Sequence, residues 1–225
     1  KHSMRMYLAD RVKPDLLVAL DRERYGGDLA AARELLRSWD NTVAADSRGG
    51  MLFETWWDRY SDLMDERELH RIPWRADDAV ATPIGLASDS VAAAAFPWAV
   101  AETTRRWGAW DVAWGDVNRV RRGAVDVPVG GCNGALGCFR VLTLRPTADG
   151  KRVAAGGDGW VIAAEFGATP RAYSILAYGQ SPDSTSRWHA NQAAMFASNE
   201  MKPVYWTEDD IAAHTVQRYR PGTRP

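Results

Sequence analysis

A serine, a carboxylate and a histidine lie close together in the last quarter of the chain, at Ser181, Asp183 and His189. Such a set can cleave an amide when the histidine accepts the hydroxyl proton and the carboxylate orients the imidazole. No Gly-x-Ser-x-Gly sequence surrounds a serine here, and Gln180-Ser181-Pro182 is typical of a turn that leads into a helix. We therefore expect His189 to be a structural, partly exposed side chain.

Ser3 is the only serine near the N-terminus, and cleavage after His2 would expose it as a terminal nucleophile. In such an enzyme the α-amino group, whose pKa is about 8, accepts the hydroxyl proton. The apolar residues among the first 20 recur at helical spacing, which argues against a nucleophile that leads a strand. No catalytic residue is predicted in this chain.

The acidic and glycine-rich clusters have structural explanations. Carboxylates in residues 62–68 spread around a predicted helix as a solvated face, and those in residues 208–210 favour a helix N-terminus electrostatically. The glycine pairs at 130–131 and 156–157 lack the Lys-Ser/Thr of a phosphate loop. We predict no metal site and no cofactor. The acidic residues are Asp62, Asp65, Glu66, Glu68, Glu208, Asp209 and Asp210.

Two cysteines, Cys132 and Cys138, lie close in sequence. Their spacing fits either a small disulfide-closed loop or two buried thiols. A metal site is disfavoured, because no histidine or second cysteine pair stands at ligand spacing.

The chain contains 11 tryptophans. Exposed indoles can form a carbohydrate-binding surface, but tryptophan is also a large core residue whose N–H needs one partner. Because most of them sit in helical apolar patterns, packing is the favoured interpretation. Examples are Trp39, Trp56, Trp57 and Trp107.

Composition excludes several classes of protein. The 225 residues are 46% hydrophobic, enough to bury a core. The formal charge is -1, so no broad basic surface is available for nucleic acid. The longest apolar stretch, residues 91–101, is far shorter than the roughly 20 residues that cross a bilayer. We expect neither nucleic acid nor membrane as a partner.

Helical periodicity dominates the first half of the chain. A helix is expected through residue 20, bent or divided at Pro14, and a second over residues 29–39 with Asp28 as its N-cap. Asp46 or Ser47 is expected to cap a third, over residues 51–64. A fourth is expected over residues 88–107, with a kink or boundary at Pro97.

The pattern changes after Trp114, where strands are expected over residues 138–144, 159–166 and 172–178. Their short connections favour one antiparallel sheet. Helices return over residues 189–197 and 207–214. The order of elements indicates an α+β fold, with a mainly helical region 1–112 and a strand-rich region 113–225 that ends in helices.

Four blocks, in order, resemble the penicillin acylase family. One is the Trp-Asp segment, Leu36–Asp40, with the Asp46-Ser47 pair and helix that follow it. The next is Trp114-Gly115 with residues 119–131, and the third is Gly157–Val161 with Phe166. The last is Gly179-Gln180-Ser181 with the histidine-bearing segment up to Gln192. The family usually has an acidic residue where this chain has Asn191, so no carboxylate-dependent role is expected there.

The resemblance implies an N-terminal nucleophile hydrolase with an αββα core, to which the predicted antiparallel strands would belong. Such precursors cleave themselves into a small and a large subunit, and the new N-terminal serine of the large subunit attacks the amide. Backbone N–H groups and an asparagine meet the oxyanion. Neither that serine, nor the asparagine, nor the calcium ligands of some members map onto this sequence. The chain looks like the C-terminal portion of the large subunit, starting after these residues.

The functional hypothesis is therefore a scaffold part of an amidohydrolase that cleaves an N-acyl substrate. The substrate classes are a β-lactam side chain, an acyl-homoserine lactone and an acylated peptide. The expected partners are the small acylase subunit and the preceding part of the large subunit, in the periplasm or outside the cell. This chain alone is predicted to be inactive. The alternatives are a non-catalytic, Trp-rich ligand-binding module and a fragment that folds but does nothing by itself.

Overall fold

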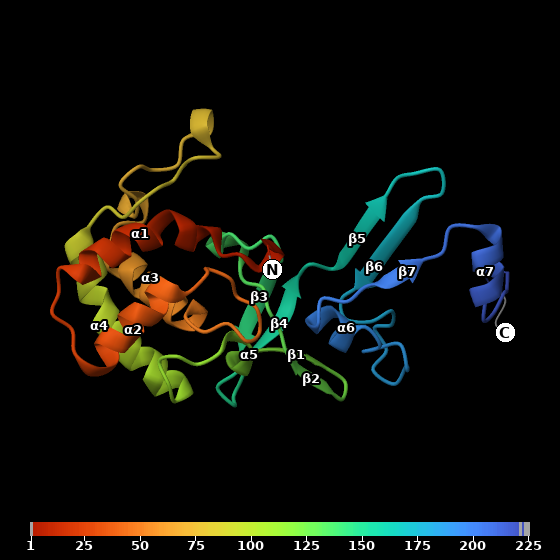
Figure 1. Ribbon diagram of the computed structural model, residues 1–225. Coiled ribbons are helices and arrows are strands. Elements are labelled where there is room, and N and C mark those ends of the chain that lie inside the picture. The colour runs from red at the N-terminus through yellow and green to blue at the C-terminus, as the bar shows by residue number, and fades with distance from the viewer. Residues whose placement is uncertain (1, 221, 223–225) are drawn as a thin grey trace. The chain divides into compact units, whose positions relative to one another are not determined.

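The structure is a computed structural model that describes residues 2–220 and residue 222. The chain divides into two compact units, Lys1–Asp158 and Gly159–Pro225. Unit 1 holds helices α1 to α5 and strands β1 to β4, and unit 2 holds strands β5 to β7 with helices α6 and α7 (Figure 1). The sequence-based regions 1–112 and 113–225 stay a prediction; the boundary between the compact units lies at Asp158.

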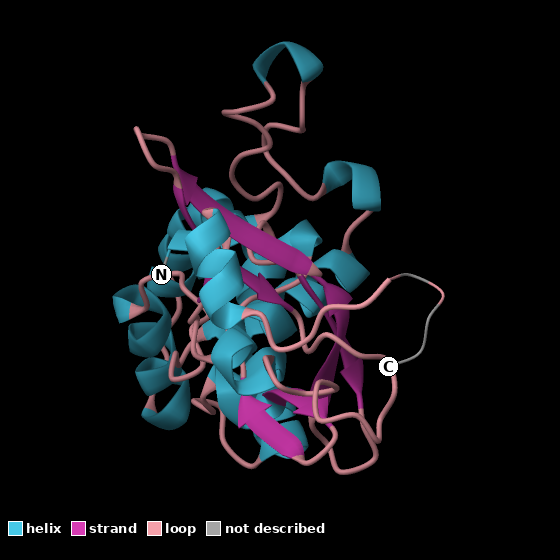
Figure 2. Ribbon diagram, turned by 90° about the vertical axis from the view of Figure 1, so that its right-hand side faces the viewer, coloured by secondary structure: helices cyan, strands magenta, loops and turns pink. Residues whose placement is uncertain are grey.

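Four long helices build the core of unit 1. They are α1 (Tyr7–Asp21), α2 (Gly27–Ser38), α3 (Gly50–Leu63) and α4 (Asp89–Trp107), and α4 contacts each of the other three. Figure 2 draws the helices in cyan and the strands in magenta. Each helix buries one apolar stripe, as its 3.6-residue periodicity predicts. The largest fully buried side chains from these helices include Leu16, Leu20, Leu36, Phe53, Trp56, Tyr60 and Phe96.

The predicted tryptophan packing is confirmed at the core. Trp56 and Trp114 are fully buried and Trp39 is 6% exposed, while Trp57 and Trp107 are partly buried against the same cluster. Each buried indole N–H has a partner: Trp56 Nε1 donates to the Ala92 carbonyl at 2.9 Å, and Trp114 Nε1 to the Gly131 carbonyl at 3.1 Å. Trp39, Trp56 and Trp114 therefore anchor the fold and are not available as a ligand platform.

Several helix starts differ from the sequence-based expectation. Gly26, not Asp28, is the N-cap of α2, and Asp28 lies in the first turn. The prediction that Asp46 or Ser47 caps the third helix is wrong. The Ser47 hydroxyl donates to the Thr42 carbonyl, 2.6 Å away, so this serine closes a loop and α3 starts only after Gly49, whose φ is 100°. Pro14 and Pro97 lie inside helices that neither of them divides.

Short elements complete unit 1. The 3-10 helices are His2–Met4, Glu66–Glu68, Ala76–Asp78 and Gly134–Leu136, and α5 is Trp114–Val117. The four-stranded sheet has the order β2-β1-β4-β3, with β1 (Asn118–Arg122), β2 (Val125–Pro128), β3 (Leu142–Pro146) and β4 (Arg152–Gly157). Its pairs are antiparallel except β1–β4, which is parallel.

Cys132 and Cys138 form a disulfide in unit 1. Both cysteines are buried, and among the described residues no cysteine is free. The strand expected over residues 138–144 consequently starts late, at Leu142, because Cys138 belongs to the disulfide-closed loop.

Unit 2 is a three-stranded antiparallel sheet with two short helices. The order is β5-β6-β7, with β5 (Trp160–Glu165), β6 (Arg171–Leu176) and β7 (Lys202–Val204), followed by α7 (Glu208–His214). Helix α6 (Ala193–Ala197) lies between β6 and β7 in sequence. The expectation of one sheet for all three predicted strands is wrong, because β3 pairs with β4 and not with β5 or β6.

The α+β class is confirmed. Within the part of the chain that the structure describes, no helix is both long and apolar enough to cross a membrane.

Candidate functional site

The structure places Ser181, Asp183 and His189 in one loop of unit 2, where they make the contacts of a turn. The imidazole Nδ1 of His189 lies 3.1 Å from the backbone carbonyl of Ser181. The Ser181 hydroxyl oxygen accepts from the Asp183 backbone N–H, and the Asp183 carboxylate accepts from the backbone and hydroxyl of Thr185. These are bonds of a turn, as Gln180-Ser181-Pro182 predicts. His189 is half-buried.

The close packing of this loop requires a glycine at position 179. A Cβ at Gly179 would collide with the backbone carbonyls of Trp188 and His189. The loop closes by hydrogen bonds from Gln180 N to Trp188 O (2.8 Å) and from Gln192 N to Tyr178 O (3.2 Å). The buried Gln192 side chain also accepts from the Leu176 N–H at 2.9 Å, which ties the loop to β6. The segment that carries the family resemblance therefore has a structural explanation.

Ser3 lies in the first 3-10 helix, and its carbonyl accepts from Arg140 N at 2.6 Å. This placement gives it a role in joining the N-terminal segment to the loop before β3. Among the acidic residues, the Asp65 side chain accepts from Arg67 N and starts a 3-10 turn. Thr207 caps α7 by accepting from Asp210 N. Within the described residues, no three His, Cys, Asp or Glu side chains are placed to hold a metal ion.

Unit 1 contains a polar cluster that the sequence did not predict, centred on Arg152 and Glu54. Arg152 Nη2 on β4 lies 2.8 Å from Glu54 Oε2 on α3, and both side chains are less than 20% exposed. Arg152 Nε also donates to Asn118 Oδ1 at 2.8 Å. The guanidinium lies 5.4 Å from the Trp114 ring centroid and 6.0 Å from that of Trp107. Such multiple contacts fix the arginine in one orientation.

Asp58 stands one helical turn after Glu54 on α3. The Asp58 side chain is exposed, but neighbouring protein atoms remove part of its hydration. This desolvation and repulsion from the Glu54 carboxylate raise its pKa to about 6. Two nearby guanidinium groups, Arg152 and Arg106, oppose this shift. Carboxyl groups with a raised pKa are more common at functional sites than elsewhere.

Glu54 and Asp58 line a pocket of about 460 Å³ between α3, the C-terminal end of α4 and the β3–β4 hairpin. This volume lies in the range of about 300–1,000 Å³ that is usual for small-molecule sites. Its wall combines charged and apolar side chains. The other lining residues are Thr55, Arg105, Arg106, Trp107, Leu144, Pro146, Thr147, Gly150, Lys151 and Arg152.

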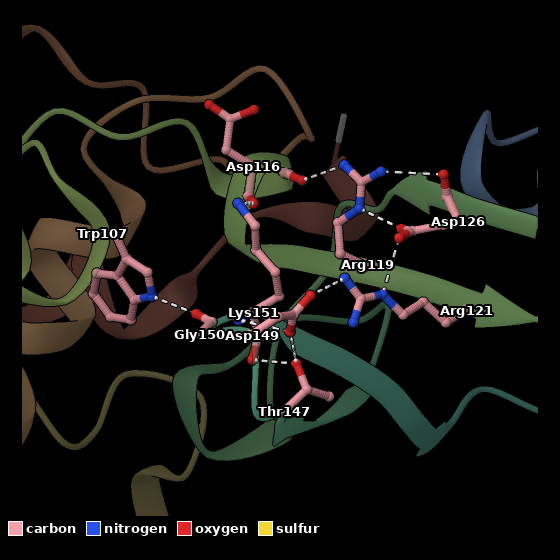
Figure 3. A network of polar contacts seen from close by, with 10 residues as sticks. Trp107, Asp116, Arg119, Arg121, Asp126, Thr147, Asp149, Gly150 and Lys151 are labelled. Carbon is pink, nitrogen blue, oxygen red and sulfur yellow. Dashed lines mark hydrogen bonds and ion pairs between the residues drawn. The ribbon is translucent and has the colours of Figure 1, made fainter.

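A network of ion pairs and hydrogen bonds holds the hairpin wall of this pocket (Figure 3). Arg121 bridges Asp126 on β2 and Asp149 in the β3–β4 turn, at 3.0 and 2.6 Å. The Arg121 guanidinium, with the Thr147 hydroxyl, holds the pKa of Asp149 far below its usual range. Lys151 Nζ donates to the Asp116 carbonyl at 2.6 Å, and Trp107 Nε1 to the Gly150 carbonyl at 3.2 Å. The turn is thus fixed to both α4 and α5.

Six of the residues that line this pocket are charged, and none of them is a serine, cysteine or histidine. One signal in the sequence pointed to it: Glu54, Asp58 and Asp62 recur every four residues along α3. Like charges at this spacing repel one another, so a nearby cation would stabilise the row of carboxylates. The contact with Arg152 could not be foreseen, since it joins residues 98 positions apart.

Comparison with known proteins places this chain in a family. The penicillin amidase family model matches residues 1–213. The chain is 31% identical over 220 residues to the acyl-homoserine lactone acylase PvdQ of Pseudomonas fluorescens, covering 92% of this chain and 28% of that protein. It is 29% identical over 226 residues to the aculeacin-A acylase of Actinoplanes utahensis, covering 93% and 27% respectively.

Among solved structures, a thermostable penicillin G acylase from Alcaligenes faecalis matches 99% of this chain and 47% of its own, with a TM-score of 0.50 and 14% identity. That likeness concerns the fold. The chain belongs to the penicillin amidase family. It spans less than a third of the length of the two acylases that it matches in sequence.

Proposed function

We propose that this chain is a scaffold part of an acylase that hydrolyses the amide bond of an N-acyl substrate, and that another segment supplies the nucleophile. The observation that carries the proposal is the family match over residues 1–213 together with the small share, 28% and 27%, of the two acylases that the chain covers. The structure adds support, because Ser181, Asp183 and His189 make turn contacts.

The substrate classes follow from the relatives. Their names refer to an acyl-homoserine lactone, aculeacin A and penicillin G, which gives three groups of N-acyl compound. The relative that is 31% identical makes an acyl-homoserine lactone the first substrate to assay. The chemistry proposed for the complete acylase is attack by an N-terminal serine on an amide carbonyl, with the α-amine of that serine as base.

Unit 2 supports a role within a larger acylase. Strand β5 is an edge of its sheet and pairs with β6 alone among the described strands. Trp160 and Ile162 on this strand are exposed, as is Phe166 beyond its end. Natural proteins rarely leave such an apolar edge uncovered. We propose that the preceding part of the large subunit packs against β5 within the αββα core. The small subunit is the second proposed partner.

The Cys132–Cys138 disulfide supports a periplasmic or secreted location, since disulfides persist in oxidising compartments. No cofactor enters the proposed chemistry.

Hydrolysis assays on the complete acylase polypeptide that contains residues 1–225 test this function. Incubation with an N-acyl-homoserine lactone should release the fatty acid and homoserine lactone, measured by mass spectrometry, and the 225-residue chain alone should release neither. Ser181→Ala and Ser3→Ala variants of the complete protein should retain turnover. Loss of all turnover in a folded Ser181→Ala or Ser3→Ala variant would refute the scaffold role, and an inactive complete protein would refute the acylase assignment.

The alternative of a Trp-rich binding module remains a prediction. A saccharide titration followed by tryptophan fluorescence tests it, and a saturable response without any acylase partner would favour the module.

A further inference from the structure

One wall residue of the pocket between α3, α4 and the β3–β4 hairpin lacks a partner. Glu54 forms an ion pair with Arg152. Arg105 and Arg106 both bind Glu102, and Lys151 donates to the Asp116 carbonyl. Asp58, in contrast, makes no hydrogen bond or ion pair to any residue that the structure describes. An unpaired carboxylate that lines a pocket gains from a partner of opposite charge.

The charges that face Asp58 come from three elements. Glu54 and Asp62 on its own helix raise its pKa, whereas Arg106 on α4 and Arg152 on β4 lower it. Those two arginines are already engaged: Arg106 Nε lies 2.6 Å from Glu102 Oε1, and Arg152 Nη2 lies 2.8 Å from Glu54 Oε2. With partial burial as the largest cause, the pKa of Asp58 is raised to about 6 despite these two arginines.

We propose that this pocket binds a small organic cation, an alkylammonium or alkylguanidinium, whose charged group pairs with Asp58. The alkyl part would lie along the apolar wall formed by Leu144, Pro146 and the Trp107 ring. This site stands on unit 1 alone and does not depend on the proposed acylase activity.

An anionic ligand fits the same pocket less well. An anion would have to share the Arg105 and Arg106 guanidinium groups with Glu102, and the unpaired Asp58 carboxylate would repel it. Arg152 is held by Glu54 and Asn118 at once. A cation at Asp58 displaces none of these bonds, so its binding leaves the walls of the pocket intact.

Calorimetric titration of the complete protein with n-butylammonium, n-butylguanidinium, butyrate and n-butanol tests the proposal. The two cations should bind saturably, and butyrate and n-butanol should not. Affinity should rise roughly tenfold from pH 5 to pH 7.5, because Asp58 must be ionised and its ionised fraction grows through a pKa of about 6. Absence of cation binding, or binding of butyrate in its place, would overturn the proposal; neither result requires a variant.

Asp58→Asn, nearly identical in shape, should weaken cation binding at pH 7.5 at least tenfold and remove its pH dependence. Asp62→Asn is the matched control, since Asp62 lies one turn further along α3 and outside the pocket lining. Equal binding by wild type and the Asp58 variant would contradict the assignment. Thermal unfolding of both variants verifies that they are folded.

Discussion

Arg152 on β4 and Glu54 on α3 form an ion pair with 2.8 Å between Nη2 and Oε2, across 98 residues of sequence. Both side chains are largely buried, and the arginine is further held by Asn118. This contact connects the helical core of unit 1 to its sheet, and both residues line the pocket between α3, α4 and the β3–β4 hairpin.

Removing one member of this pair should destabilise unit 1. In Arg152→Met, the Glu54 carboxylate and the fully buried Asn118 side chain lose their partner. The expected loss is on the order of 3 kcal/mol in the free energy of unfolding, since an uncompensated buried charge remains. Denaturant titration measures it. Arg145→Met on β3, at an exposed arginine, is the matched control and should change stability by about 0.5 kcal/mol or less. Equal effects of both substitutions would contradict the role of the pair.

Gly179→Ala should disturb the loop of residues 178–192. The added methyl group meets the backbone carbonyls of Trp188 and His189, which cannot move without breaking the loop hydrogen bonds. We expect a cost of about 2 kcal/mol and faster hydrogen exchange at Gln180 and Gln192. Gly159→Ala provides the control, because a Cβ at that position has open space around it. Unchanged exchange in the Gly179 variant would show that the loop tolerates a side chain there.

Loss of the Cys132–Cys138 disulfide should lower stability moderately. The bond closes a loop with a sequence separation of only 6, so the chain-entropy estimate is about 2 kcal/mol. A Cys132→Ala/Cys138→Ala double variant should show this loss in thermal unfolding, and a reducing agent should lower the melting temperature of the wild type but not of the variant. A reductant effect of the same size on both proteins would exclude the disulfide as its cause.

Asp58 should titrate near pH 6 in the folded protein. Because its folded pKa is raised above the unfolded value of about 3.9, the folded state binds more protons between these two values. The Asp58 contribution therefore becomes less favourable as pH rises from about 4 to 6, and stays constant above that. Carbon-13 NMR of the aspartate carboxyls, assigned with Asp58→Asn, measures the midpoint directly. A midpoint at or below pH 4 would show that the recess leaves Asp58 hydrated.

The agreement between sequence and structure is best where the signals are local. Helix α4 was expected over residues 88–107 and runs from Asp89 to Trp107, because Ser88 caps its start and Gly108, with a φ of 85°, ends it. Strands β5 and β6 lie within two residues of their predicted bounds, since each is an apolar run between turn residues.

Strand β1 and the pocket were not predicted, because both depend on residues distant in sequence. Strand β1 carries Arg119, Arg121 and Arg122, so its sequence shows no apolar alternation; it is stabilised by pairing with β2 and β4. The pocket was missed for the same reason, since its walls join residues 54–58, 105–107 and 144–152. The loop around Ser181 was interpreted correctly as a turn, because its turn chemistry lies within the segment itself.

The central claim is that residues 1–225 support an acyl-transfer site whose nucleophile lies elsewhere in the acylase. Covalent labelling of the complete, active protein with a serine-directed sulfonyl fluoride, followed by peptide mapping, tests it most directly. The label should abolish hydrolysis of the N-acyl substrate and should be found on a serine outside residues 1–225. A stoichiometric label on Ser3 or Ser181 that tracks the loss of activity would contradict the claim.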